Sequence, residues 1–197
     1  SALYVRERKY SINKVSENYE GMSKSAELRV ISRSFVLLLK NLGVPFVKKT
    51  EIPYRLPQWI KEAPLWIKRN FLAGLFGADG SILNFKKFKP LPINLTQTKK
   101  AELEENLLNF FKDIKSLLEE FGIYSIIYKI KSKNNVTYRL SIVGEENIKA
   151  FVGKISYEYD LKKKEQSAFG YAYLIRKQWI EDSRKETSIV ALETYKY

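Results

Sequence analysis

The chain has 197 residues, and its 35 Lys and Arg against 22 Asp and Glu give a formal net charge of +13. A charge of this size indicates a polyanionic partner, with nucleic acid as the first candidate. The chain contains neither Cys nor His, which excludes disulfides, thiolate and imidazole metal sites, Ser-His-Asp hydrolysis and zinc deaminase chemistry from these residues.

The N-terminal third predicts a helix followed by an extended connector. Apolar residues at helical spacing predict a helix over residues 25–42, closed by Gly43. The prolines that follow break the chain into a connector; they are Pro45, Pro53, Pro57 and Pro64. We therefore expect residues 1–64 to form a helical extension with a Pro-rich connector. The helix end near residue 43 is similar to the one near residue 122, which indicates either the remnant of a second core unit or a shared type of helix end.

The middle of the chain alternates between helical and strand patterns. A helix is predicted from Pro64 to Gly80, then short strands over residues 81–89 and 91–97, and a long helix over residues 99–121.

A hairpin and two further helices complete the predicted order of elements. Strands over residues 125–131 and 136–142 are joined by a turn at Asn134-Asn135. In the first of these strands the alternation predicts a core-facing row of Ile126, Tyr128 and Ile130. Helical patterns follow near residues 145–152 and 161–179, and the residues after 180 carry no diagnostic pattern.

The most informative segment is Leu-Ala-Gly-Leu-Phe-Gly-Ala-Asp-Gly, residues 72–80, at the end of the helix after Pro64. Its small residues allow another backbone to come close, and Asp79 falls in the last turn. Helix C-termini carry partial negative charge and favour cations. A carboxylate in that turn therefore indicates a compensating positive species, and a divalent metal would serve.

This segment resembles the signature of the LAGLIDADG homing endonucleases at seven of nine positions and continues into Gly80-Ser81-Ile82. The other interpretation is a small-residue helix that ends at a glycine cap. The resemblance implies an α+β fold in which a core unit αββαββαα, over residues 65–180, carries a curved antiparallel DNA-binding sheet. Residues 181–197 would then be a C-terminal tail.

The resemblance also implies a catalytic site. Asp79 would bind Mg²⁺, with Mn²⁺ or Ca²⁺ able to replace it. Gln97 would position a water molecule, unless it only begins the next helix. A lysine would lie near the scissile phosphate, and Lys163 fits that position best among Lys162, Lys163 and Lys164, although a triple-lysine run is also typical of a solvated face.

A single copy of the signature implies that a second Asp79 comes from a second chain, and hence a twofold homodimer. The expected dimer interface consists of Leu72, Ala73, Gly74 and Gly77. The polar faces of the strands would contact DNA, with Arg139 as the best candidate for a base contact; each of these residues can instead be an ordinary solvent-facing position. The expected DNA-binding residues are Lys87, Lys89, Asn94, Thr96, Lys129, Lys131, Thr137, Arg139 and Ser141.

We therefore expect a homing endonuclease that hydrolyses both strands of a long, roughly palindromic DNA site with Mg²⁺, encoded in an intron or as a free-standing gene. The alternative is a catalytically inactive relative that binds nucleic acid as a regulator or as an intron RNA maturase, because fold and charge do not establish cleavage. No membrane partner is expected, since no apolar run approaches about 18 residues. A small-molecule substrate is not expected either. The N-terminus lacks the pattern of a signal peptide, which predicts an intracellular protein.

Overall fold

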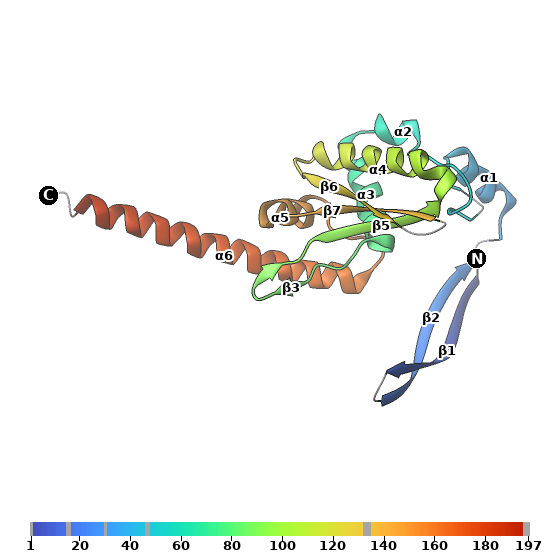
Figure 1. The fold of residues 1–197 in the computed structure, drawn as a ribbon, viewed down its shortest axis with the longest axis horizontal. Coiled ribbons are helices and arrows are strands. Elements are labelled where there is room, and N and C mark those ends of the chain that lie inside the picture. Colours follow the sequence, from blue (N-terminus) through green and yellow to red (C-terminus); the bar gives the residue numbers. More distant parts are fainter. Residues whose placement is uncertain (1, 15–16, 30, 46–47, 132–134, 195–197) are drawn as a thin grey trace. The chain divides into compact units, whose positions relative to one another are not determined.

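The computed structural model describes residues 2–14, 17–29, 31–45, 48–131 and 135–194. It divides into two compact units, Ser1–Val44 and Pro45–Tyr197. Helices and antiparallel strands occur in both units (Figure 1). The expected α+β class is confirmed.

The first unit consists of a β-hairpin and one helix. Strands β1 (Ala2–Lys14) and β2 (Glu17–Arg29) pair along their whole length, and α1 (Arg33–Asn41) follows. The expected helical extension is wrong for the hairpin residues, and the helix predicted over residues 25–42 begins only after Ser32, whose side chain accepts a hydrogen bond from the Phe35 amide. Leu28, which contributed to the helical pattern, instead pairs with Leu3 in the hairpin.

The second unit contains all the other elements. The helices are α2 (Gln58–Lys61), α3 (Leu65–Asp79), the short 3₁₀ turn η1 (Ala101–Leu103), α4 (Glu104–Glu119), α5 (Glu145–Lys154) and α6 (Leu161–Thr194). The strands are β3 (Phe85–Lys86), β4 (Lys89–Pro90), β5 (Ile93–Lys100), β6 (Ser125–Lys131) and β7 (Asn135–Ile142).

The main sheet has three antiparallel strands in the order β5-β7-β6. The two strands predicted over residues 125–131 and 136–142 are confirmed to within one residue, whereas Asn134 of the predicted turn lies outside the described residues. The strand predicted over residues 81–89 is reduced to the small hairpin β3–β4 and an isolated bridge between Gly80 and Leu95. That bridge brings the end of α3 to the free edge of β5.

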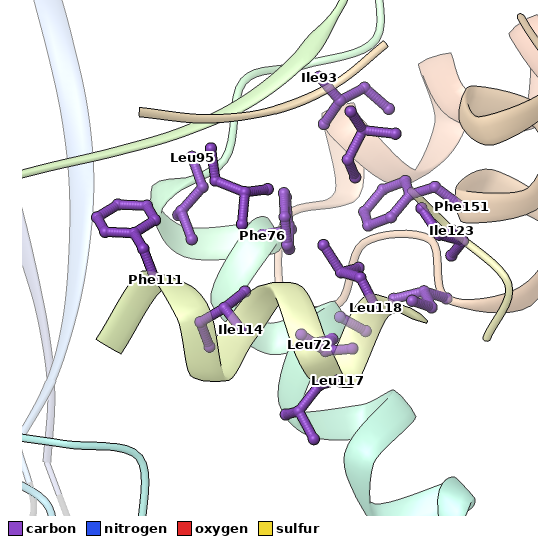
Figure 2. Close-up of a cluster of buried hydrophobic side chains, with 14 of the residues drawn as sticks. Leu72, Phe76, Ile93, Leu95, Phe111, Ile114, Leu117, Leu118, Ile123 and Phe151 are labelled. Carbon is purple, nitrogen blue, oxygen red and sulfur yellow. The ribbon is translucent and has the colours of Figure 1, made fainter. Parts of the chain in front are cut away.

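A hydrophobic core fills the space between this sheet and the helices on one of its faces. Leu72 and Phe76 of α3 converge with Ile114 and Leu118 of α4 beneath the β5 side chains, as Figure 2 shows. Both helices present apolar residues three and four positions apart, the spacing that places them on one face. Helices therefore cover one face of the sheet, and several side chains on the other face are exposed.

The last helix is longer than its sequence pattern indicates. The pattern predicts a helix to about residue 179, but α6 continues without a break to Thr194 (Figure 1). The boundary expected at residue 180 is therefore not the end of an element. None of the described helices, α6 included, combines the length and the apolar character needed to cross a bilayer.

Candidate nucleic-acid interface

The end of α3 combines an exposed carboxylate with a neighbouring ammonium group. Asp79 is exposed in the last turn. The Lys163 ammonium from the first turn of α6 donates to the carbonyl oxygen of Gly77 at 2.6 Å and lies 3.5 Å from those of Phe76 and Ala78. A cation at a helix C-terminus is favourable, so Lys163 supplies at least part of the positive charge that the sequence of this turn calls for.

The structure distinguishes among the three consecutive lysines of α6. Lys164 forms an ion pair with Glu158 at 3.0 Å, and this hydrogen bond is the main cause that holds the pKa of Glu158 below its usual range. Lys162 is exposed. The Lys163 amide donates to Asp160 Oδ1 at 3.0 Å at the start of α6, and the Lys163 ammonium lies 3.7 Å from Asp160 Oδ2 as well as beside the α3 carbonyls. Lys163 is thus the lysine that lies beside the Asp79 turn, and its catalytic role stays a prediction.

Gln97 belongs to a partly buried polar group that the sequence did not reveal. On β5 it lies on the face that the helices cover, where the Tyr54 hydroxyl donates to its Oε1 at 2.5 Å. Burial, and after it the charge of Asp79, raise the pKa of Tyr54 to about 12, against the opposite effect of the Gln97 hydrogen bond. Tyr54 therefore lies within electrostatic reach of Asp79. The only feature of the sequence that could have drawn attention to Tyr54 is its position directly after Pro53.

Lys99, the next residue but one on β5, holds Tyr54 in place beside Gln97. Its ammonium lies 3.8 Å from the centre of the Tyr54 ring and donates to the Ile52 carbonyl at 2.8 Å and to Asn106 Oδ1 at 2.7 Å. Although these contacts favour the charged form, burial outweighs them and lowers the pKa of Lys99 to about 8. The connector before α2 is thereby fixed against β5 and α4, and it carries Tyr54 to Gln97.

The oxygen atoms at the end of α3 could bind a metal ion only if water completed most of its coordination shell. Among the described residues no three carboxylates or other ligating side chains gather at one point, and the Gly77 carbonyl already accepts from Lys163. Mg²⁺ is often bound through one or two carboxylates, with water and substrate phosphate completing the shell. Asp79 fits that role as a single carboxylate, and metal binding there remains a prediction.

A row of polar side chains crosses the open face of the sheet between β5 and β7. Ser141 Oγ donates to Asn94 Oδ1 at 2.6 Å, Arg139 Nε donates to Thr96 Oγ1 at 3.4 Å, and the hydroxyls of Thr98 and Thr137 lie 2.7 Å apart. These are directly opposed residues in the β5–β7 register, so their side chains share one face. The structure thus brings together Asn94, Thr96, Thr137, Arg139 and Ser141 from the predicted DNA-binding set, although Ser141 is only 4% exposed.

The predicted faces of β6 are reversed. In the β6–β7 register Ile126, Tyr128 and Ile130 oppose the polar residues Ser141, Arg139 and Thr137, and all three are exposed. The alternate residues oppose the buried row of β7 instead, including Lys129, which forms an ion pair with Glu104 of α4.

Lys129 is therefore not on the proposed binding face. Lys131 opposes Val136 on the covered face by register, and its side chain is outside the described residues. An apolar alternation cannot tell which face is covered, because a one-residue shift exchanges them.

The two lysines expected before β5 lie in the small hairpin. Lys87 is at its tip and Lys89 begins β4, and both are exposed. Neither has an ion-pair partner in the described part of the chain. They remain candidates for contact with phosphate.

Three of the four residues expected at a dimer interface are taken up by packing within the chain. Leu72 and Ala73 are fully buried. A Cβ atom on Gly77 would lie 1.9 Å from the Glu158 carbonyl oxygen, and the Glu158 amide donates to the Ala73 carbonyl at 3.0 Å. Gly74 faces the Tyr159 ring. The close approach that these residues permit is therefore made within one chain.

Comparison with known proteins identifies both a domain and a set of longer relatives. The family model described as a LAGLIDADG-like domain matches residues 66–156. A tRNA-splicing ligase RtcB of Methanopyrus kandleri is 58% identical over 98% of this chain, and one of Pyrococcus furiosus is 57% identical over 98%. The DNA-directed RNA polymerase subunit Rpo1N of Methanocaldococcus jannaschii is 32% identical over 88%. The matching segments make up 20%, 20% and 13% of these proteins, so the chain spans about a fifth of the ligases it matches.

These relatives overturn the expected function. Proteins that match nearly the whole chain are named for the ligation of tRNA, an RNA reaction, and not for cleavage of DNA. The expectation of a double-strand DNA endonuclease active in intron homing is therefore corrected, and so is the expectation of a palindromic DNA partner bound by a homodimer.

In these relatives the matching segment is a minor part of a longer protein. The lack of Cys and His in 197 residues consequently describes this segment alone. The order of elements from α3 to α5 is consistent with the LAGLIDADG-like domain whose family model matches residues 66–156.

Proposed function

We propose that this chain is a LAGLIDADG-like nucleic-acid-binding module carried within a tRNA-splicing ligase, and that it binds RNA rather than performing the ligation. The observation that supports this proposal most directly is the open face of the β5-β7-β6 sheet, where Arg139 and Tyr128 are opposed and exposed. The relatives' names make RNA the partner to test first.

The chemistry of this face suits unpaired bases. Sheets that bind single-stranded RNA present exposed aromatic side chains on which bases stack, with arginine and polar groups for hydrogen bonds. Tyr128 lies between Ile126 and Ile130 on the edge strand, and the polar row of β5 and β7 lies beside them. The excess of basic residues supplies attraction to phosphate that does not depend on sequence.

The end of α3 adds a place for phosphate at the edge of the same sheet. The Ser81 amide donates to the Asn94 carbonyl at 2.7 Å, and the Asn94 amide donates to Ser81 Oγ at 2.8 Å. These bonds hold the Asp79 turn against β5, and Asn94 also belongs to the open face. Lys163 would attract a phosphate bound there, and Asp79 would hold a Mg²⁺ ion that adds positive charge for that phosphate.

The occurrence of the segment in differently named proteins supports a separable module. A polymerase subunit and the ligases share it, although their names denote different reactions. A segment whose role is binding can serve in both settings, because function lies in a site and not in the host's reaction.

Fluorescence anisotropy with a labelled single-stranded RNA, a tRNA transcript and a DNA duplex of equal length tests the proposal. Arg139→Ala should weaken RNA binding about ten-fold, and Tyr128→Ala should do the same by removing a stacking surface. Lys112→Ala is the control, because it removes one positive charge from the exposed side of α4, on the covered side of the sheet. Equal loss in all three variants, or stronger binding to the DNA duplex than to either RNA, would refute the proposal.

A further inference from the structure

We propose that the groove between the β3–β4 hairpin and α6 binds an unpaired nucleobase, so that bound RNA is held by stacking there as well as on the open sheet face. This inference rests on the proposed function, and it names the part of the nucleic acid that the groove recognises. The groove has a volume of about 530 Å³ and is lined mainly by Phe85, Phe88, Phe169 and Tyr173.

Two phenyl groups are exposed at this groove without any packing role in the domain. Phe88, at the tip of the hairpin, is 79% exposed, and Phe169 on α6 is also 79% exposed. Exposed aromatic residues that gather at one place mark a binding site more often than scattered ones do. Their flat faces match the faces of nucleobases, on which stacking is strong and tolerant of sequence.

The hairpin tip holds an unfavourable backbone conformation that presents these groups. Lys86 and Lys89 pair across the hairpin, and both residues between them have positive φ, 49° for Lys87 and 66° for Phe88. Two-residue turns of this kind normally contain Asn and Gly, since bulky residues disfavour the left-handed region. A Lys-Phe pair here gives up local stability and places a cation beside an aromatic ring, which is the combination that binds a nucleotide's phosphate and base.

The groove is preformed because the hairpin is fixed to α6. The Phe85 and Tyr173 rings meet edge to face with centres 5.3 Å apart, and the Tyr173 hydroxyl donates to the Phe88 carbonyl at 3.2 Å. Gly170 permits this approach, since a Cβ atom there would lie 2.5 Å from a Leu83 methyl carbon. A preformed groove binds with a smaller entropic cost than one that must be ordered by its ligand.

Charge at the groove favours nucleic acid over an apolar protein segment. Lys86, Lys87 and Lys89 lie within four residues of the hairpin, and none has an ion-pair partner in the part of the chain that the structure describes. An apolar partner gains nothing from the three exposed lysines, whereas a nucleotide carries both a planar base and a phosphate that they attract. The occupant we infer is therefore an unpaired base of a single-stranded RNA.

The test uses the whole chain and RNA strands of about 12 nucleotides, a length within the range of single-strand binding sites. One strand carries 2-aminopurine, whose fluorescence falls on stacking, and a second has the same backbone with abasic positions. Phe88→Ala and Phe169→Ala should each weaken binding to the base-containing strand about ten-fold and reduce the fluorescence change. Neither should alter binding to the abasic strand, and Phe88→Trp should retain both signals.

Control variants separate this inference from the proposed function. Trp66→Ala removes an exposed aromatic residue at the start of α3 and should leave both signals unchanged. If Arg139→Ala weakens binding while Phe88→Ala and Phe169→Ala do not, the groove inference fails and the proposed function stands; if the parent chain binds no RNA, both fail. A concentration-dependent dimer that Phe169→Ala converts to monomers would show that a second copy fills the groove, which also overturns the inference.

Discussion

Replacing Gly77 by alanine separates packing within one chain from packing between two chains. The added Cβ atom would lie 1.9 Å from the Glu158 carbonyl oxygen, which is a backbone atom. Inserting a methyl group into a filled site costs about 1–3 kcal/mol. Displacing this backbone would also lose the hydrogen bond from the Glu158 amide to the Ala73 carbonyl, worth about 1 kcal/mol.

Alanine is also the better helix former, and it recovers about 1 kcal/mol relative to glycine. The expected net loss for Gly77→Ala is therefore about 1–3 kcal/mol in the free energy of unfolding. Gly74→Ala is the matched control in the same helix, because its Cβ atom would meet only the Tyr159 ring at an ordinary 3.5 Å. That variant should be stabilised by up to about 1 kcal/mol.

Urea unfolding followed by circular dichroism measures both variants, at two protein concentrations, with the slope on denaturant checked for constancy. Opposite signs for the two substitutions, independent of concentration, are the expected result. Destabilisation of both variants that grows on dilution would instead mean that the small residues pack between chains. A Gly77→Ala chain as stable as the parent would refute the assigned contact with Glu158.

Three further changes test the surroundings of Asp79. Lys163→Met should lower the free energy of unfolding by roughly 1–2 kcal/mol, because it removes a charged donor from the Gly77 carbonyl; thermal unfolding checks this, and an unchanged midpoint contradicts it. Asp79→Asn should leave RNA binding without metal intact but abolish any increase on adding Mg²⁺, measured by anisotropy with and without EDTA; a metal response equal to the parent's would place the ion elsewhere. Lys99 has a pKa lowered to about 8 by burial, so the unfolded chain holds its proton more tightly and stability should rise from about pH 8 to 10.5. Lys99→Met should lack that rise in a pH series of urea unfolding, and the same rise in both proteins would show that another group titrates.

Sequence patterns predicted correctly those elements whose apolar spacing matches the face that they bury in the fold. The strand at residues 125–131 and the helix that became α4 could be placed within a few residues, since Leu107, Phe111, Ile114 and Leu118 repeat at helical spacing. The N-terminal hairpin was missed because Leu28 fits a helical repeat as well as a strand. The far part of α6 gave no signal, since exposed residues such as Ile189 and Val190 form no buried stripe.

The candidate site shows a different limit of sequence reasoning. The faces of β6 were exchanged because Ile126 and Tyr128 alternate as core residues do, although they are exposed. Lys129 lies on the covered side by register, yet it stays exposed on the edge strand and pairs with Glu104 of α4. A partner 25 residues away cannot be read from a strand pattern. Tyr54 and the hairpin groove likewise depend on contacts between segments far apart in the chain.

The signature segment itself divides into a part that the fold explains and a part that it does not. Gly77 is needed to admit the Glu158 backbone, and Ala73 and Leu72 fill the core, so these residues would be required even if the domain bound nothing. Asp79 is different, because it is exposed and forms no hydrogen bond or ion pair within the described part of the chain. A carboxylate in the negative end of a helix is unfavourable, and the Lys163 ammonium beside it bonds to the carbonyls of the turn rather than to this side chain. Packing therefore does not explain an acidic residue at this position. A ligand that brings positive charge to Asp79 would explain it.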